Sequence, residues 1–212
     1  MAVDLRDRQS PIKDQGRRGT CVACAATAGH EMLRAEGIDL CVEFLHWAAK
    51  QRDGLSATAE GTTLPAAAES LTQVGQPPEA TWPYDERRNQ WSHDYQPPPD
   101  ACAAAPTRRL TASAPLPVTP TALRDALNQG QAVLLGIRLH RTWHEVGANG
   151  KIAMPVAGDR DFGGHAVLVV GHQDDALIVR NSWGAEWGEG GYGYLPNTYV
   201  DAYGVAAWAL DL

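Results

Sequence analysis

Residues 15–34 read QGRRGTCVACAATAGHEMLR, in which a loop with two glycines runs directly into an apolar stretch. The apolar side chains over 22–33 recur at helical spacing, and Gly37 follows as a stop signal. Thr20 is of a residue type that caps helix N-termini, so we expect Cys21 to open the helix. The free N–H groups and partial positive charge at that end favour a thiolate, which predicts a lowered pKa for Cys21.

Outward from this helix the chain changes from helical to strand-rich. Two further helices are predicted over about 42–52 and 64–74, and a short one over 121–128. Residues 76–120 hold many prolines, which suit an irregular wall and a strap crossing between two lobes. The predicted strands cover 132–139, 165–171, 176–180, 190–195 and 205–210. We therefore expect an α+β fold with a helical lobe, an antiparallel β lobe and a cleft between them.

Length and composition describe an ordinary globular chain. Its 212 residues are enough for one large domain or two small lobes with hydrophobic cores. They are 44% hydrophobic and 20% charged, which is the usual balance of a globular protein. Eighteen basic against twenty-five acidic residues give a net charge of -7. Because duplex-binding proteins usually carry a basic face, we expect no nucleic acid partner. The longest apolar runs, 132–135 and 166–170, have only strand length, so no membrane partner is expected either.

The N-terminus and the cysteines bear on the cellular compartment. Residues 1–8 read MAVDLRDR and lack the apolar core of a signal peptide. The four cysteines, Cys21, Cys24, Cys41 and Cys102, are too few and too scattered for a disulfide framework. We therefore predict a reducing, cytoplasmic location. Secretion of a chain whose leader was removed is the alternative.

Three polar or aromatic residues of the last third complement Cys21. His165 opens an apolar strand directly after two glycines, which allow a substrate backbone to approach the imidazole. Asn181 follows the strand across the hairpin, where its amide can accept the imidazole N–H, and Trp183 can shield that bond from water. Considered alone, Cys21 fits a buried core thiol as well as it fits a nucleophile, and His165 fits a core histidine whose ring nitrogens are hydrogen-bonded. Their combination with Asn181 favours nucleophilic catalysis.

These residues resemble the three signature blocks of papain-like cysteine peptidases. The blocks are Gln15-Gly16-x-x-Gly19-Thr20-Cys21, Gly164-His165-Ala166-Val167, and Asn181-Ser182-Trp183-Gly184 with Trp187-Gly188 and Gly191-Tyr192. Segments 3–6, 60–64 and 82–84 extend the likeness over almost the whole chain, and it is weakest over 85–120. The resemblance implies a single papain-like, two-lobed domain over 1–212. Its helical lobe covers about 9–112, and its β-barrel-like lobe covers about 113–212 together with an N-terminal strand at 1–8.

The resemblance also implies a role for each site residue. Cys21 is the nucleophile, His165 the general acid and base, and Asn181 the residue that orients His165. Gln15, six positions before Cys21, suits an oxyanion donor beside the Cys21 N–H. The implied substrate-binding residues are Gly61, Thr62, Leu64, Gly136, Gly164 and Trp183. The expected partners are a polypeptide substrate and a proteinaceous inhibitor or pro-segment outside this chain, and neither a metal nor an organic cofactor is expected.

The chain departs from the family pattern at several positions. Arg18 stands where family members usually carry a disulfide-bonded cysteine, and the partner position near Ala59 lacks cysteine too. Val22 replaces the aromatic residue that normally follows the nucleophile. Thr62 replaces the second glycine of a pair on the cleft wall, which predicts modified backbone pairing to substrate there. We therefore expect all four cysteines to be free.

Other interpretations stay open. Cys21-x-x-Cys24 has the spacing of a redox pair, but no thioredoxin-like pattern surrounds it, and we interpret Cys24 as core. His140 and His144 have the spacing of helix-borne metal ligands without an evident third ligand, which favours solvated loop histidines. At the level of function, the alternatives to an endopeptidase are a catalytically silent peptide-binding module and a thiol acyltransferase or isopeptidase.

Overall fold

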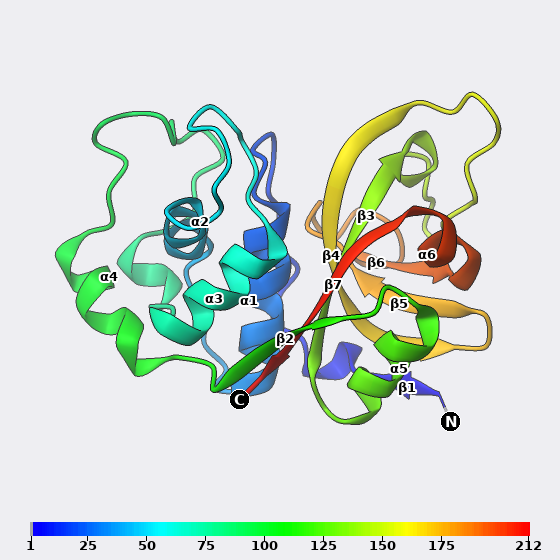
Figure 1. Ribbon diagram of the computed structural model, residues 1–212, viewed down its shortest axis with the longest axis horizontal. Helices are drawn as coiled ribbons and strands as arrows, with labels where there is room; N and C mark the ends of the chain where they lie inside the picture. Colours follow the sequence, from blue (N-terminus) through cyan, green and yellow to red (C-terminus); the bar gives the residue numbers. More distant parts are fainter. Residues whose placement is uncertain (1) are drawn as a thin grey trace.

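Helix α1 (Cys21–Arg34) stands between a group of helices and a β-sheet in the computed structural model, which describes residues 2–212 (Figure 1). The helices on its outer side are α2 (Val42–Lys50), α3 (Leu64–Gln73) and α4 (Pro99–Ala104). The sheet lobe adds α5 (Pro120–Asn128) and α6 (Asn197–Tyr203). Short 3₁₀ turns lie at Arg6–Arg8, Glu79–Thr81, Ala105–Thr107 and Arg141–Trp143. Over residues 2–212, none of the helices has the length and apolar character that a membrane span requires.

Within residues 2–212, seven strands form one antiparallel sheet in the order β2-β7-β3-β4-β5-β6, with β1 paired to β4 beside that path. The strands are β1 (Val3–Asp4), β2 (Ala112–Leu116), β3 (Ala132–His140), β4 (Asp161–Gln173), β5 (Ala176–Arg180), β6 (Tyr192–Pro196) and β7 (Gly204–Asp211). The predicted α+β class is therefore confirmed. The N-terminal strand is shorter than predicted, because the chain turns into a 3₁₀ helix at Arg6.

Helix α1 begins at Cys21 as predicted, but Thr20 does not cap it through its side chain. The Thr20 hydroxyl lies 2.8 Å from Tyr84 Oη instead. The helix ends at Arg34, because Ala35 adopts a left-handed backbone with φ of 51°, two residues before the predicted stop at Gly37. The end of α1 therefore depends on a residue type that rarely takes this conformation.

The proline-rich segment 76–120 is more ordered than predicted. Pro99 occupies the first turn of α4, where a missing N–H costs no helical hydrogen bond. Pro115 lies inside β2, which is an edge strand paired with β7. Edge positions tolerate proline because one side of the strand has no partner to satisfy. The strap between the lobes is thus partly built of regular structure, as Figure 1 shows for β2.

Two further boundaries differ from the predictions. Strand β4 begins at Asp161 rather than at 165, because its pairing with β3 continues through Gly164 opposite Arg138 and Asp161 opposite His140. The glycines before His165 therefore belong to the strand. Strand β6 begins at Tyr192 rather than at 190, and helix α6 was not predicted.

One core cluster is shared by α1, α3 and the sheet. At Gly29 of α1, an added Cβ would lie 3.1 Å from Ala132 Cβ and 3.2 Å from Leu168 Cδ1, so the helix rests directly on β3 and β4. Burial of each large aliphatic side chain in such a core stabilises the fold by about 1.5–3 kcal/mol. This packing sets the first residue of α1 beside strand β4.

Candidate active site

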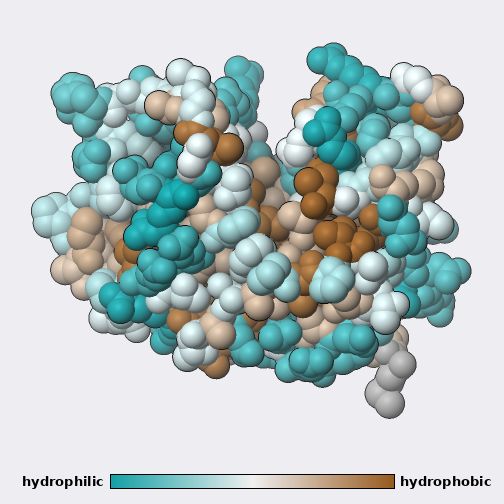
Figure 2. Space-filling view, in the orientation of Figure 1, coloured by the Kyte–Doolittle hydropathy of each residue, from teal (hydrophilic) through white to brown (hydrophobic). Residues whose placement is uncertain are grey.

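Cys21 and His165 line the same cleft between the lobes. The cleft has a volume of about 470 Å³, and its wall contains the start of α1, the segment Gly61–Pro65, and parts of β3, β4 and β7. Figure 2 shows the hollow between the two lobes in the same orientation as Figure 1. Cys21 comes from the first turn of α1, whereas His165 comes from β4, where it pairs with Ile137. Two residues 144 positions apart in the sequence thus share one solvent-accessible wall.

Asn181 follows directly on β5 and holds His165. His165 Nε2 lies 2.8 Å from Asn181 Oδ1. An amide oxygen can only accept, so this bond places the proton on Nε2 and leaves Nδ1 as the basic nitrogen of a neutral ring. The backbone N–H of Ser182 donates to the same amide oxygen over 2.8 Å, which keeps the Asn181 side chain in place.

Aromatic rings cover the His165–Asn181 bond. The Trp183 ring lies 5.0 Å from that of His165, and Trp143 approaches edge-on at 5.9 Å. His165 is 5% exposed, in keeping with the predicted shield. Trp143 was not singled out in the sequence, because it lies in a 3₁₀ turn between β3 and β4 with no motif around it.

His140 and His144 differ from one another. The interpretation of His140 as a solvated loop residue is wrong: it ends β3, is buried, and its Nδ1 lies 3.0 Å from Tyr199 Oη. Tyr199 belongs to the unpredicted helix α6, so no local pattern around His140 indicates this burial. His144 is exposed and stacks on Trp183 at 5.0 Å, at the edge of the site.

Burial acts on both groups of the pair. It raises the pKa of the Cys21 thiol, although the N–H groups of Ala166, Val22 and Cys21 itself oppose this. It lowers the pKa of His165 to about 4, against the hydrogen bond to Asn181. Taken one at a time, both groups are therefore neutral at pH 7. The expectation that the helix N-terminus alone lowers the pKa of Cys21 is wrong, because desolvation outweighs it.

Gln15 is 8% exposed and is not among the residues that line the cleft. Its Nε2 donates to the carbonyl of Arg18 over 2.8 Å, and its Oε1 accepts from Ser182 Oγ over 2.6 Å. The amide nitrogen carries two hydrogens, so one N–H remains after the bond to Arg18. The side chain is held at both ends, as a fixed donor would have to be.

Five of the six predicted substrate-binding residues line the cleft, namely Gly61, Thr62, Leu64, Gly136 and Gly164. Trp183 is not part of that lining and instead packs on His165. The cleft also contains Val205 and Ala206 of β7, a segment for which the sequence predicts only a strand. Their position depends on the pairing of β7 with β3, where Ala206 lies opposite Gly136.

All four cysteines are free, as predicted. Cys24 is 3% exposed in the shared core, and Cys41 accepts a hydrogen bond from Phe44 N at the start of α2. Burial raises the pKa of each of these two thiols to about 12. Neither is therefore an accessible thiolate beside Cys21.

This fold is that of the papain-like cysteine proteases. Xylellain, a cysteine protease from Xylella fastidiosa, has a TM-score of 0.89 over 99% of this chain and 85% of its own, at 24% identity. Digestive procathepsin L 3 of Tenebrio molitor has a TM-score of 0.76 over 100% of this chain and 69% of its own, also at 24% identity. At such identities these likenesses concern the fold.

The chain belongs to the papain family of cysteine proteases, whose family model matches residues 1–210. Among relatives in sequence, "Peptidase 1" of Dermatophagoides farinae is 29% identical over 209 residues. That match covers 91% of this chain and 60% of the mite protein. The chain thus spans less than two thirds of the length of this relative.

Proposed function

We propose that this protein is a cysteine endopeptidase that cleaves peptide bonds with Cys21 as nucleophile and His165 as general acid and base. The observation that carries the proposal is the His165 Nε2–Asn181 Oδ1 bond, which orients an imidazole on the wall of the cleft that also holds Cys21. Family membership supports the same chemistry. The domain that carries it is the whole of 1–212, with the lobes divided near 112.

The catalytic state requires Cys21 and His165 to be charged together. Burial disfavours a lone thiolate and a lone imidazolium, but a proton moved from Cys21 to His165 creates two opposite charges that stabilise each other. The helix N-terminus and the N–H of Ala166 add to the stabilisation of the thiolate. In this state Asn181 Oδ1 accepts a hydrogen bond from Nε2 of the imidazolium and so keeps the His165 ring in its orientation.

Hydrolysis then proceeds in two halves. The thiolate of Cys21 attacks the scissile carbonyl carbon and forms a tetrahedral intermediate. The Cys21 N–H and the remaining N–H of Gln15 donate hydrogen bonds to the oxyanion of this intermediate. His165 gives its proton to the leaving amine as the C–N bond breaks, which leaves a thioester on Cys21. The neutral imidazole next takes a proton from water, the resulting hydroxide attacks the thioester, and release of the acid restores the thiolate and imidazolium.

The substrate is proposed to lie extended along Gly61, Thr62 and Gly164, a polypeptide being the partner that such a wall fits. One of the structural neighbours is a proform, which supports a pro-segment as a second kind of partner. We also infer a reducing, cytoplasmic location, supported by the four free thiols. Thiol titration in denaturant after non-oxidising preparation should find four groups.

The test combines labelling with hydrolysis. An epoxide directed at papain-like enzymes should give a single adduct, on Cys21, and the labelled protein should no longer cleave a fluorogenic peptide. Product masses from a folded protein substrate should include internal cuts, which distinguishes an endopeptidase. Retained peptide binding without any turnover indicates a silent binding module, and an amine acceptor that outcompetes water indicates an acyltransferase.

Four variants separate the proposed roles. Cys21→Ala should abolish turnover and His165→Ala should be nearly as severe, while circular dichroism shows both folded. Gln15→Ala should lower kcat by roughly 10²–10³ with little change in KM, the effect of losing one oxyanion donor. Asn181→Ala should keep measurable activity, because the amide only orients His165. Wild-type hydrolysis by Cys21→Ala, once contaminating protease is excluded, contradicts the proposal.

A further inference from the structure

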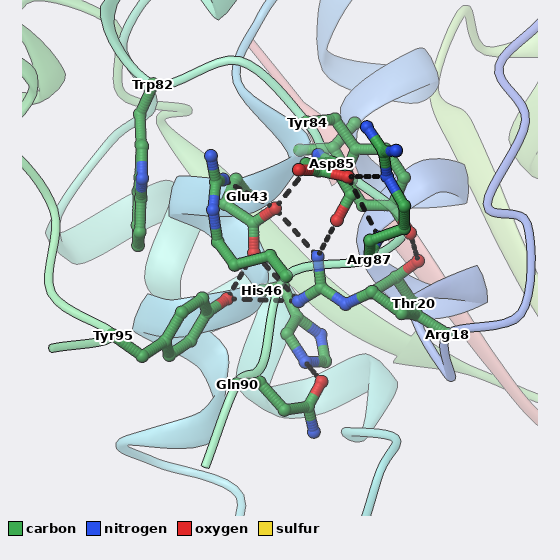
Figure 3. Close-up of polar contacts among 12 residues, drawn as sticks. Arg18, Thr20, Glu43, His46, Trp82, Tyr84, Asp85, Arg87, Gln90 and Tyr95 are labelled. Atoms are coloured by element: carbon green, nitrogen blue, oxygen red, sulfur yellow. Dashed lines mark hydrogen bonds and ion pairs between the residues drawn. The ribbon is translucent and has the colours of Figure 1, made fainter. Parts of the chain in front are cut away.

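Arg18 lies three residues before Cys21, and its side chain is directed into the helical lobe towards Glu43 of α2 (Figure 3). The two groups form a two-pronged ion pair, with Nη1–Oε2 at 2.7 Å and Nη2–Oε1 at 2.8 Å. The Glu43 side chain is 0% exposed and that of Arg18 8%. A fork-shaped pair fixes distance and orientation together, and burial protects it from water and salt.

Neighbouring groups bond to both charged side chains, although Arg18 Nε is buried without a hydrogen-bond partner among residues 2–212. Tyr95 Oη donates to Glu43 Oε1 over 2.6 Å, and the carbonyl of Asp85 accepts from Arg18 Nη1 over 3.0 Å. The ring of Tyr84 lies 5.2 Å from the guanidinium carbon, within cation–π range. Figure 3 shows Arg18 enclosed by these groups. The side chain therefore has one well-defined position.

The main chain of the same residue is tied to the proposed oxyanion hole. The carbonyl of Arg18 accepts from Gln15 Nε2 over 2.8 Å and from the N–H of Thr20 over 2.8 Å. Tyr84 Oη donates to the Gln15 carbonyl over 2.7 Å and lies 2.8 Å from Thr20 Oγ1. Thus the groups that hold the guanidinium and the groups that hold the loop 15–20 form one connected network.

We propose that Arg18 is a positioning residue for the oxyanion hole: its ion pair with Glu43 fixes the loop so that the free N–H of Gln15 and the N–H of Cys21 stay aimed at one point. This inference rests on the proposed function. Oxyanion donors stabilise a transition state because they are oriented in advance. A misplacement of about 1 Å can lower the rate by roughly 10².

The first variant is Arg18→Lys, which keeps the charge but loses the fork. It should lower kcat for a peptide amide about tenfold, a part of the loss expected when the donor is removed altogether, and leave KM within about twofold. The double variant Arg18→Met with Glu43→Gln removes both charges of the pair, so that only the more exposed Arg88 loses a partner, and it should lower kcat to the same extent. Arg88→Lys is the matched control. Arg88 also forms an ion pair with Glu43, at 2.9 Å, but its side chain is more exposed than that of Arg18. It donates a hydrogen bond to the carbonyl of Pro83 and none to the loop 15–20.

Two readouts separate positioning from a general loss of structure. Alkylation of Cys21 by iodoacetamide occurs at a tetrahedral carbon and forms no oxyanion, so its rate should stay within about twofold in the Arg18 variants. In a Gln15→Ala background, Arg18→Lys should cost less than about twofold in kcat, because both act through the same N–H. Tyr84→Phe leaves the Arg18–Glu43 ion pair intact and should lower kcat less than Arg18→Lys does. Its effect on kcat should likewise shrink in the Gln15→Ala background.

The inference is overturned if Arg18→Lys and Tyr84→Phe match the wild type in kcat. It is also overturned if their losses multiply in full with that of Gln15→Ala, or if alkylation slows in parallel with hydrolysis. Failure of the proposed function is a different result, in which the wild type itself neither hydrolyses peptides nor takes the epoxide on Cys21.

Discussion

Ser182 Oγ donates a 2.6 Å hydrogen bond to Gln15 Oε1, and so links the loop before α1 to the residue that follows Asn181. The backbone N–H of the same serine donates to Asn181 Oδ1. One residue therefore contacts both amides of the proposed site, one from each lobe. Movement of the lobes against each other would disturb the Ser182–Gln15 bond, whereas the Ser182–Asn181 bond lies within one lobe.

Ser182→Ala should weaken the orientation of Gln15 without removing its N–H groups. The Oε1 end of the amide would lose its donor, and the side chain could rotate about its last bond. We expect kcat to fall about tenfold, less than for Gln15→Ala, with KM unchanged. Steady-state kinetics check this, with Ser113→Ala on the edge strand β2 as control. A loss as large as that of Cys21→Ala would show that Ser182 does more than orient the amide.

His165→Ala should turn Cys21 into a half-buried thiol without a charged partner. Burial raises the pKa of Cys21, and without the imidazolium nothing of opposite charge offsets it. A raised pKa means less thiolate at pH 7, so the midpoint of iodoacetamide alkylation should move above the usual thiol value of about 8.5. The wild type should still label Cys21 at about pH 5.5, well below that value. Peptide mapping separates the label on Cys21 from that on the exposed Cys102. Equal labelling of the two cysteines in the wild type at this pH contradicts the prediction.

Gly136→Ala should narrow the apolar part of the cleft. A Cβ at this position would lie 3.6 Å from Leu64 Cδ1 and 3.6 Å from the Ala206 carbonyl, which is ordinary contact, so the fold should tolerate it. By resemblance to the family, we expect this pocket to take the residue two before the scissile bond, and its residues Leu64 and Gly136 predict an apolar preference over Arg.

With Gly136→Ala, kcat/KM for Leu at that substrate position should fall about tenfold relative to Ala, the scale of one methylene of fit. Gly147→Ala, where the added Cβ would have no atom within 4 Å, is the matched control. A peptide library in which Arg is the best residue, or in which the profile does not change, argues against this pocket.

Two buried histidines should make the fold sensitive to mild acid. Burial lowers the pKa of His30 and of His46 to about 4, below the unfolded value of about 6.5. A lowered pKa in the folded state means stability that is present above pH 6.5 and is lost as the pH falls towards 4. Each imidazole should remove roughly 2 kcal/mol of unfolding free energy between pH 7 and 5.

Urea unfolding of His46→Gln at pH 7 and pH 5 measures this contribution. The difference between the two pH values should be smaller than in the wild type by roughly 2 kcal/mol. His93→Gln serves as control, because its side chain is 90% exposed. An unchanged pH dependence in His46→Gln would falsify the assignment.

The parts of the site that lie on strong local patterns could be predicted from the sequence. Cys21 opens a helix whose apolar spacing is regular, His165 lies on the apolar strand β4, and Asn181 follows the next strand of the hairpin. Glycines next to these residues mark positions where the absence of a side chain lets another group approach the main chain. Such local signals determine where a residue stands along its own element.

Contacts between elements that are distant in sequence could not be predicted in the same way. The pairing of Arg18 with Glu43 depends on how α2 packs against the loop before α1. The burial of His140 depends on Tyr199. The partial burial of Cys21, which reverses its expected pKa shift, depends on the whole cleft. The strand β2 escaped prediction because proline disfavours strands unless they lie at an edge, and the edge is defined only by the assembled sheet.

The close approach of α1 to the sheet at Gly29 has a consequence for how the molecule moves. Because α1, α3 and four strands of the sheet contribute to one core, the lobes cannot swing about a hinge without opening that core to water. The chain should therefore unfold in a single cooperative transition instead of lobe by lobe. We therefore expect the width of the cleft to stay constant in the native state, so that a bound peptide adapts to it by extending its own backbone while the protein stays rigid.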